Sequence, residues 1–150
     1  EETARLREVS PLPLVADEDF TELLVLDDLA GAYDGINVKL MKCGGLREAV
    51  ASIHAARGRG LQVLLGCFVE SSLGIAAASH LAPLVQWADL DGAALLADDP
   101  FGPAPVERGR ILPPAGAGLG VDPAPDTEAP GTPGASGAGD AWDSPEDPGV

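Results

Sequence analysis

The chain has 150 residues, of which 45% are hydrophobic, and its formal net charge is −15 at pH 7. A chain of this size and composition can bury one globular core. The acidic balance argues against binding to nucleic acids or to an anionic membrane surface, because both attract basic faces. No apolar run is long enough to span a membrane and no signal peptide opens the sequence, so we expect a cytoplasmic protein.

Composition divides the chain into two parts. Residues 122–150 contain seven acids, eleven Gly or Pro residues and no Lys or Arg. Such a stretch buries too little apolar surface to offset the entropy of ordering, so it predicts a disordered acidic tail. Residues 1–121 are therefore the expected structured domain. Cys43 and Cys67 form no metal-binding spacing, and we expect both to be reduced and buried.

The structured part alternates between strand and helix patterns. Four apolar runs predict strands, and three segments between or after them predict helices; the strands are expected within 11–19, 35–41, 61–69 and 85–92, and the helices at 20–30, 45–59 and 71–84. Repeated βα units of this length predict an α/β fold with a parallel sheet. Residues 93–121 change character and are expected to leave the sheet as an extended piece and a glycine-rich turn.

Charged residues stand at the expected carboxyl end of each strand. They are Asp17 with its neighbours Glu18 and Asp19, then Lys39, then Glu70, and finally Asp89 and Asp91. In parallel α/β sheets and barrels the functional residues gather at this end of the strands. Each residue also has a plainer explanation, since Asp17 could cap the next helix and the Asp89/Asp91 pair could be solvated loop acids.

Lys39 lies in a strand that is otherwise apolar. Side chains alternate along a strand, so Lys39 shares a face with Asn37 and Met41, away from the aliphatic residues that pack against helices. A lysine held near carboxylates inside a barrel or cleft can transfer a proton to or from carbon, although it could also extend to the surface. Lys42 has the opposite parity, and we expect a structural or solvent-facing role for it.

Five stretches together resemble one family. "PLPLVADED", "INVKLMKCGGLREA", "GCFVESSLGIAAASHLA", "DLDG" and the later "GAGLGV" are similar to the C-terminal part of the muconate-lactonizing subgroup of the enolase superfamily, and most similar to its dipeptide epimerases. The resemblance implies strands five to eight of a (β/α)8-type barrel. It also implies a Mg²⁺-dependent reaction in which a proton is removed next to a carboxylate to give an enediolate.

The resemblance also implies roles for individual residues. Asp17 matches a metal ligand, Lys39 the acid/base lysine, and Asp89 with Asp91 the pair that holds the substrate's ammonium group. The residues from Cys67 to Glu70 match the end of the seventh strand, where the wall of the substrate site lies.

The family's other two metal ligands, its second lysine and its capping domain have no counterpart in this sequence. We therefore expect a fragment of a dipeptide epimerase that is inactive alone. Its expected partners are a dipeptide substrate and either further copies of the chain or a complementing N-terminal half.

Two alternatives stay open. One is another enzyme of the subgroup, namely o-succinylbenzoate synthase, N-acylamino acid racemase or a cycloisomerase. The other is a non-catalytic half-barrel remnant.

Overall fold

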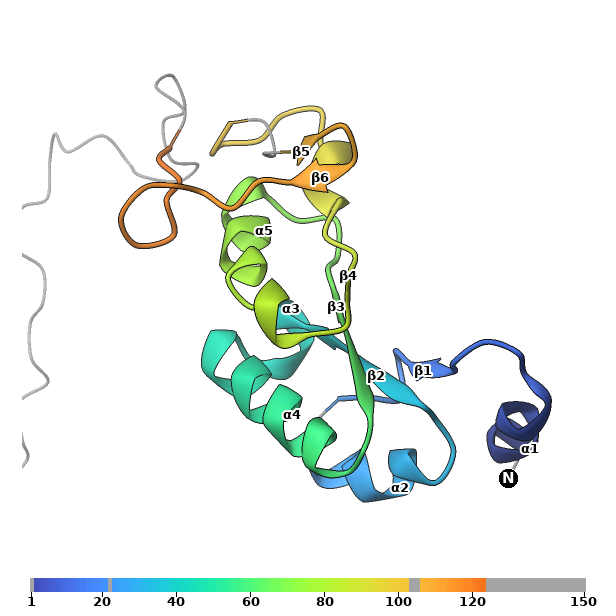
Figure 1. Cartoon of the computed structure of the whole chain (residues 1–150). Helices are drawn as coiled ribbons and strands as arrows, with labels where there is room; N and C mark the ends of the chain where they lie inside the picture. The colour runs from blue at the N-terminus through green and yellow to red at the C-terminus, as the bar shows by residue number, and fades with distance from the viewer. Residues whose placement is uncertain (1, 22, 103–105, 124–150) are drawn as a thin grey trace, which may run out of the picture.

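The computed structural model describes residues 2–21, 23–102 and 106–123, and a four-stranded parallel sheet lies at its centre (Figure 1). Its strands are β1 (Val15–Ala16), β2 (Gly35–Lys39), β3 (Gln62–Gly66) and β4 (Trp87–Ala88), and they lie side by side in chain order. The parallel sheet predicted from the sequence is confirmed. The expected tail, residues 122–150, falls almost entirely outside the described residues.

Short helices connect and follow the strands. The α-helices are α1 (Glu2–Val9), α2 (Leu26–Ala30), α3 (Leu40–Cys43), α4 (Leu46–Gly58) and α5 (Ser72–Ser79), and the 3₁₀ helices are η1 (Leu23–Val25), η2 (Ala82–Leu84) and η3 (Gly92–Leu95). Helix α4 forms as predicted, because Ala49, Ile53 and Ala56 recur at helical spacing and are all fully buried.

The two faces of the sheet differ. Ile36 and Val38 of β2 and Val63 and Leu65 of β3 are fully buried in the core, together with apolar residues of α2, α4 and α5. The alternate residues of the same strands point to the other face. Register places Lys39 beside Gly66 on that second face. The helices therefore cover one face, and the polar strand-end residues belong to the other.

The strands are shorter than the sequence predicted. Strand β2 ends at Lys39, and α3 follows directly, so Met41 does not share the strand face with Lys39 and is 71% exposed instead. Strand β3 ends at Gly66 rather than 69, and β4 covers two residues before η3 begins. The segment expected as one helix over 20–30 instead contains two short elements, η1 and α2. Continuous apolar runs caused these errors, because such a run fits a buried strand and a buried helix turn equally well.

Two segments lie outside the sheet. Helix α1, which the sequence pattern did not predict, precedes β1 and has no buried residue among those described. After η3 the chain leaves the sheet as expected, and β5 (Val106–Glu107) pairs antiparallel with β6 (Arg110–Ile111).

No helix in the described parts of the chain is long and apolar enough to cross a membrane.

Candidate active site

Lys39 and Asp17 meet at the carboxyl ends of β2 and β1. The Nζ atom of Lys39 lies 3.0 Å from Oδ2 of Asp17, and the lysine side chain is only 11% exposed. Because the two strands are adjacent and parallel, their ends bring together residues that are 22 positions apart in the chain. The sequence prediction that these two residues share one rim is confirmed.

Lys42 joins the same carboxylate, so of the two roles expected for it the structure favours the structural one over the solvent-facing one. Its Nζ atom donates to the backbone carbonyl of Asp17 at 2.7 Å and to Asp17 Oδ1 at 3.2 Å, and it lies 3.4 Å from Glu18 Oε2. Its side chain is 14% exposed. The strand-parity argument failed because the strand ends at Lys39. One helical turn then carries Lys42 back to the same side, since residues three apart are neighbours on a helix.

The two lysines control the charge of Asp17. Partial burial alone would raise the pKa of the Asp17 carboxyl, but hydrogen bonds and charges from Lys39 and Lys42 outweigh burial and hold the pKa below its ordinary value. The carboxylate is therefore ionised at neutral pH. It accepts a contact at each oxygen, from Lys42 at Oδ1 and from Lys39 at Oδ2.

Asn37 of β2 also contacts the Asp17 carboxylate. Its Nδ2 group donates to Asp17 Oδ2 at 3.2 Å, while its buried Oδ1 has no partner among the described residues. Gly66 makes room for this side chain, because a Cβ atom at position 66 would collide with Asn37 Oδ1. The sequence pattern placed Asn37 on the Lys39 face, but nothing in the pattern indicated its contact with Asp17.

Phe68 forms the opposite wall around the Lys39 ammonium. Lys39 Nζ lies 4.7 Å from the centroid of the Phe68 ring, which is close enough for a cation–π contact. Lys39 is thus held between a carboxylate and an aromatic face. The resemblance implies a site wall over residues 67–70, but the sequence does not predict the contact between Phe68 and Lys39, because Phe68 follows the end of β3 in a loop.

The other predicted site residues gather at the ends of β3 and β4. Burial is the largest cause that raises the pKa of the Cys67 thiol, and the nearby charges of Glu70, Asp89 and Asp91 raise it further. Glu70 Oε1 accepts from the Phe68 backbone N–H at 3.1 Å. Asp89 and Asp91 are exposed, and neither carboxylate has an ion pair within the described residues.

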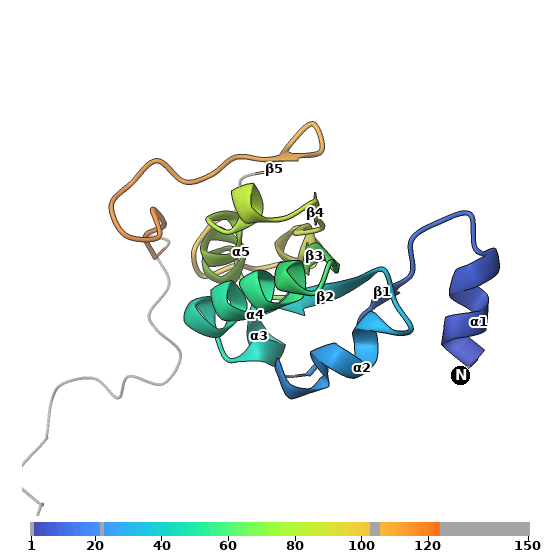
Figure 2. The same ribbon diagram turned by 60° about the horizontal axis from the view of Figure 1, so that its bottom comes forward.

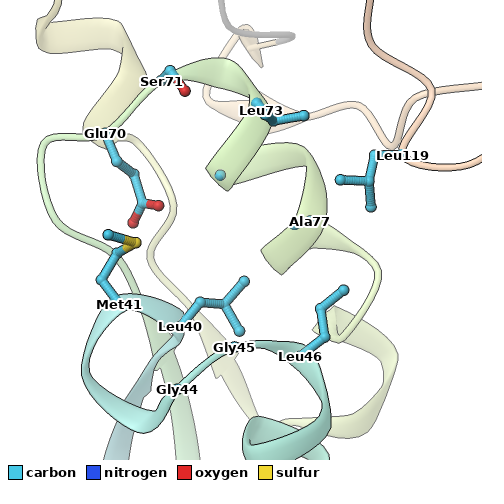
Figure 3. Close-up of a pocket in the computed structure, with 11 residues that line it drawn as sticks. Leu40, Met41, Gly44, Gly45, Leu46, Glu70, Ser71, Leu73, Ala77 and Leu119 are labelled. Carbon is cyan, nitrogen blue, oxygen red and sulfur yellow. The ribbon is translucent and has the colours of Figure 1, made fainter. Parts of the chain in front are cut away.

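A separate apolar cavity of about 590 Å³ lies between the α3–α4 turn and α5 (Figure 3). Its lining is mostly aliphatic, and Leu119 of the "GAGLGV" segment closes one side. Figure 3 shows the Glu70 carboxylate pointing toward Met41 at one end of this cavity. Lys39 and Asp17 are not among its lining residues, so the cavity is separate from the Lys39–Asp17 ion pair.

A single chain does not make a magnesium site from the residues described. Mg²⁺ requires several oxygen ligands in octahedral geometry. No group of three or more Asp, Glu, His or Cys residues in the described ranges could hold a metal ion, and both oxygens of Asp17 already contact lysines. The predicted ligand Asp17 is therefore present, but it is paired with cations.

Comparison with known proteins agrees with the fold and the residue pattern. Residues 1–127 match the family described as "Enolase C-terminal domain-like". An L-Ala-D/L-Glu epimerase of Bacteroides thetaiotaomicron is 42% identical over 121 residues, which are 81% of this chain and 32% of that protein. An N-acetyl-D-glutamate racemase of Pseudoalteromonas is 43% identical over 90 residues, covering 60% of this chain and 29% of that protein.

A solved structure shows the same architecture. The dipeptide epimerase of Cytophaga hutchinsonii, complexed with Mg and the dipeptide D-Ala-L-Val, superposes with a TM-score of 0.73 and 31% identity over 83% of this chain and 36% of that chain. The chain spans about a third of the length of the curated relatives it matches. Its sheet corresponds to part of the (β/α)8-type barrel of these enzymes, and the chain belongs to the enolase C-terminal domain-like family.

Proposed function

We propose that this chain carries part of the active site of a dipeptide epimerase, in which Lys39 transfers the proton at the carbon next to a carboxylate. The observation that carries this proposal is the placement of Lys39. Its ammonium group is nearly buried at a strand end, between Asp17 at 3.0 Å and the ring of Phe68 at 4.7 Å. Such confinement fixes the position of a proton-transfer group, which general acid–base catalysis requires.

The chemistry assigns each neighbour of Lys39 a task. A lysine accepts a proton from carbon only as the neutral amine and returns it as the ammonium. Asp17 fixes the position of the Lys39 side chain by the ion pair, Phe68 restricts the approach from the other side, and Asn37 donates a hydrogen bond to the Asp17 carboxylate. Inversion of a stereocentre needs a proton donor on the face opposite the base. One copy of the chain offers one such lysine, so we infer that a single copy does not epimerise.

The proposed substrate is a dipeptide with a free amino group. Asp89 and Asp91 are exposed carboxylates without a basic partner in the described part of the chain, so they are free to hold an ammonium group. Magnesium dependence is part of the proposal only together with carboxylates from outside a single copy, because the residues described here do not form a metal site. Two free cysteines are compatible with the reducing cytoplasm as the site of action.

A second candidate is racemisation of an N-acylated amino acid, and the similarity to the Pseudoalteromonas racemase favours it. Such a substrate has no free amine. Replacement of Asp89 and Asp91 by Asn would then leave its turnover unchanged, whereas the KM for a dipeptide would rise by tenfold or more through loss of charge-assisted hydrogen bonds. The KM values for L-Ala-L-Glu and for N-acetyl-L-glutamate are therefore compared between the native chain and the variant in which both Asp89 and Asp91 are Asn. The substrate whose KM rises in the variant is the one that these carboxylates bind.

Deuterium exchange tests the proposed role of Lys39. The chain is mixed with Mg²⁺, L-Ala-L-Glu and the N-terminal portion of the Bacteroides thetaiotaomicron relative that precedes the matched region, and incorporation at the α-carbon is measured by mass spectrometry. We expect exchange with the native chain and with His54→Gln, a control at an exposed position of α4, but not with Lys39→Met. An assembled complex that exchanges equally well with Lys39→Met would contradict the assignment. An assembled complex without any exchange would favour the non-catalytic remnant.

A further inference from the structure

The loop between β3 and α5 carries the aromatic ring that faces Lys39. Strand β3 ends at Gly66 and α5 begins at Ser72, so Phe68 lies on an irregular segment, and its side chain is 42% exposed. Irregular surface segments move more than strands and helices do, unless further contacts fix their backbone. The contacts that hold the Phe68 backbone therefore decide whether the ring stays at 4.7 Å from Lys39 Nζ.

Glu70 fixes the backbone of Phe68 at its N–H group. The Glu70 Oε1 atom accepts a hydrogen bond from that N–H at 3.1 Å, and a bond from an amide to a carboxylate is stronger than one between neutral groups. The other oxygen, Oε2, lies against α5 at Gly74, where an added Cβ atom would collide with it. The absence of a side chain at Gly74 thus leaves the space that the Glu70 carboxylate occupies.

Gly92 packs against the same residue at its carbonyl group. A Cβ atom at position 92 would collide with the Phe68 carbonyl oxygen and would lie 3.1 Å from Cys67 Sγ. The requirement for glycine there is space, since only a residue without a side chain lets η3 approach the loop so closely. Figures 1 and 2 both show α5 beside β3 and β4, the elements between which this loop and η3 lie. Phe68 is thus held at its N–H group and at its carbonyl group.

The Glu70 carboxylate lies away from the Lys39–Asp17 ion pair. It lines the apolar cavity between the α3–α4 turn and α5, at the end where Met41 lies (Figure 3). Neither Lys39 nor Asp17 lines that cavity. A carboxylate in this place can orient the loop that carries Phe68, but it does not face the position where a substrate carbon would meet Lys39.

We propose that Glu70 is a positioning residue, which holds the Phe68 ring against the Lys39 ammonium and does not itself contact the substrate. Its consequence for proton transfer rests on the proposed function, because Lys39 is the proton-transfer group there. Loss of the Glu70 acceptor frees the loop, so that Lys39 keeps its contact with Asp17 but loses the wall on its other side. Proton transfer then slows, because its rate depends on how closely the reacting groups are held in place.

A nuclear magnetic resonance experiment tests the positioning role without any turnover, because Lys39 and Lys42 are the only lysines of the chain. Ring currents move the resonances of nuclei that lie over an aromatic face upfield. With isotopically labelled lysine, we expect the ε-methylene protons of Lys39 to lie upfield of their position in Phe68→Leu. Glu70→Ala should remove most of this upfield shift, whereas Glu70→Gln, which keeps an acceptor oxygen, should retain it. An unchanged Lys42 resonance shows that each variant is folded.

A second variant disturbs the loop from its other side. Gly92→Ala places a methyl group against the Phe68 carbonyl, so it should displace the loop and reduce the upfield shift of Lys39 as well. Gly58→Ala is the matched control, because an added Cβ atom at this end of α4 meets no other atom within 4 Å among the described residues. We expect the Lys39 resonance of Gly58→Ala to equal that of the native chain. A Gly92→Ala chain that is folded and keeps the full shift would contradict the close packing on Phe68.

The kinetics of deuterium exchange give the functional readout, in the complex with the N-terminal portion of the Bacteroides thetaiotaomicron relative. Glu70→Ala should lower kcat for exchange about tenfold with little change in KM, and Glu70→Gln should restore kcat. A Glu70 that bound the substrate by its charge would instead give a raised KM in both variants, since the amide is neutral. That result would overturn the positioning role.

The outcomes separate this inference from the proposed function. A Lys39 shift that survives in Glu70→Ala, or that Glu70→Gln loses as completely as Glu70→Ala, overturns the positioning role even if exchange requires Lys39. A shift that is lost in Glu70→Ala and retained in Glu70→Gln supports the positioning role even if the complex shows no exchange. Absence of exchange then counts against the proposed function alone.

Discussion

At the scale of single residues, one carboxylate organises the site. Asp17 contacts Lys39, Lys42 and Asn37, so three side chains from β2 and α3 hold a residue at the end of β1. The sequence pattern identified Asp17 and Lys39 because charged residues at strand ends are conspicuous. It did not predict that Lys42 contacts Asp17 or that Phe68 contacts Lys39, because both contacts depend on where a strand ends, and an apolar run does not show that.

Removal of Lys42 should destabilise the fold. Lys42→Met leaves the Asp17 carbonyl and Oδ1 without their donor, and we expect a loss of about 1 kcal/mol in the free energy of unfolding, since Asp17 is partly exposed. Urea denaturation measures this. Arg47→Met is the control, because Arg47 is 92% exposed and pairs only with its neighbour Glu48 among the described residues. Equal stability of Lys42→Met and Arg47→Met would show that the Lys42 contacts do not stabilise the site.

Acid should weaken the fold through Asp17. Its pKa is lower in the folded chain than in the unfolded chain, so its ionised form stabilises the fold above the unfolded value near 3.8. That contribution is lost as the pH falls through the lower folded pKa. The free energy of unfolding of the native chain should therefore fall more steeply below about pH 4 than that of Asp17→Asn, measured by urea titration at each pH. Parallel pH curves would contradict this contribution.

At the scale of elements, the βα order was predictable and the element boundaries were not. Strand β2 and helix α4 appear where the alternating and helical patterns placed them. Helix α1 escaped prediction because none of its residues is buried, so it carries no strong apolar periodicity. The start of α5 depends on a residue far away in the sequence: the Asp99 carboxylate accepts from the Ser72 backbone N–H at 2.7 Å and from the Phe101 N–H at 3.0 Å.

Asp99 should therefore act as a cap for α5 from outside the helix. Asp99→Ala leaves the Ser72 N–H without its acceptor, and we expect a loss of about 1 kcal/mol in the free energy of unfolding, as for other lost helix caps. The neighbouring exposed residue gives a matched control, because Asp98→Ala removes the same charge without a cap contact. A loss of equal size in both variants would assign the effect to charge rather than to capping.

At the scale of the whole molecule, the chain is a parallel sheet with helices on one face and the Lys39–Asp17 ion pair on the other. The βα spacing predicted the parallel sheet, and the resemblance of five sequence stretches identified the barrel family. The sequence could not show how the second half of the site is supplied, because that depends on contacts beyond one copy of these residues.

The most direct test of this account is deuterium incorporation at the α-carbon of L-Ala-L-Glu, with Mg²⁺ present, by native chain and Lys39→Met over a range of protein concentrations. We predict no exchange from dilute, monomeric chain, and exchange that requires Lys39 once a second copy or a complementing N-terminal portion is bound. Exchange by the monomer, or exchange that persists in Lys39→Met, would contradict the account.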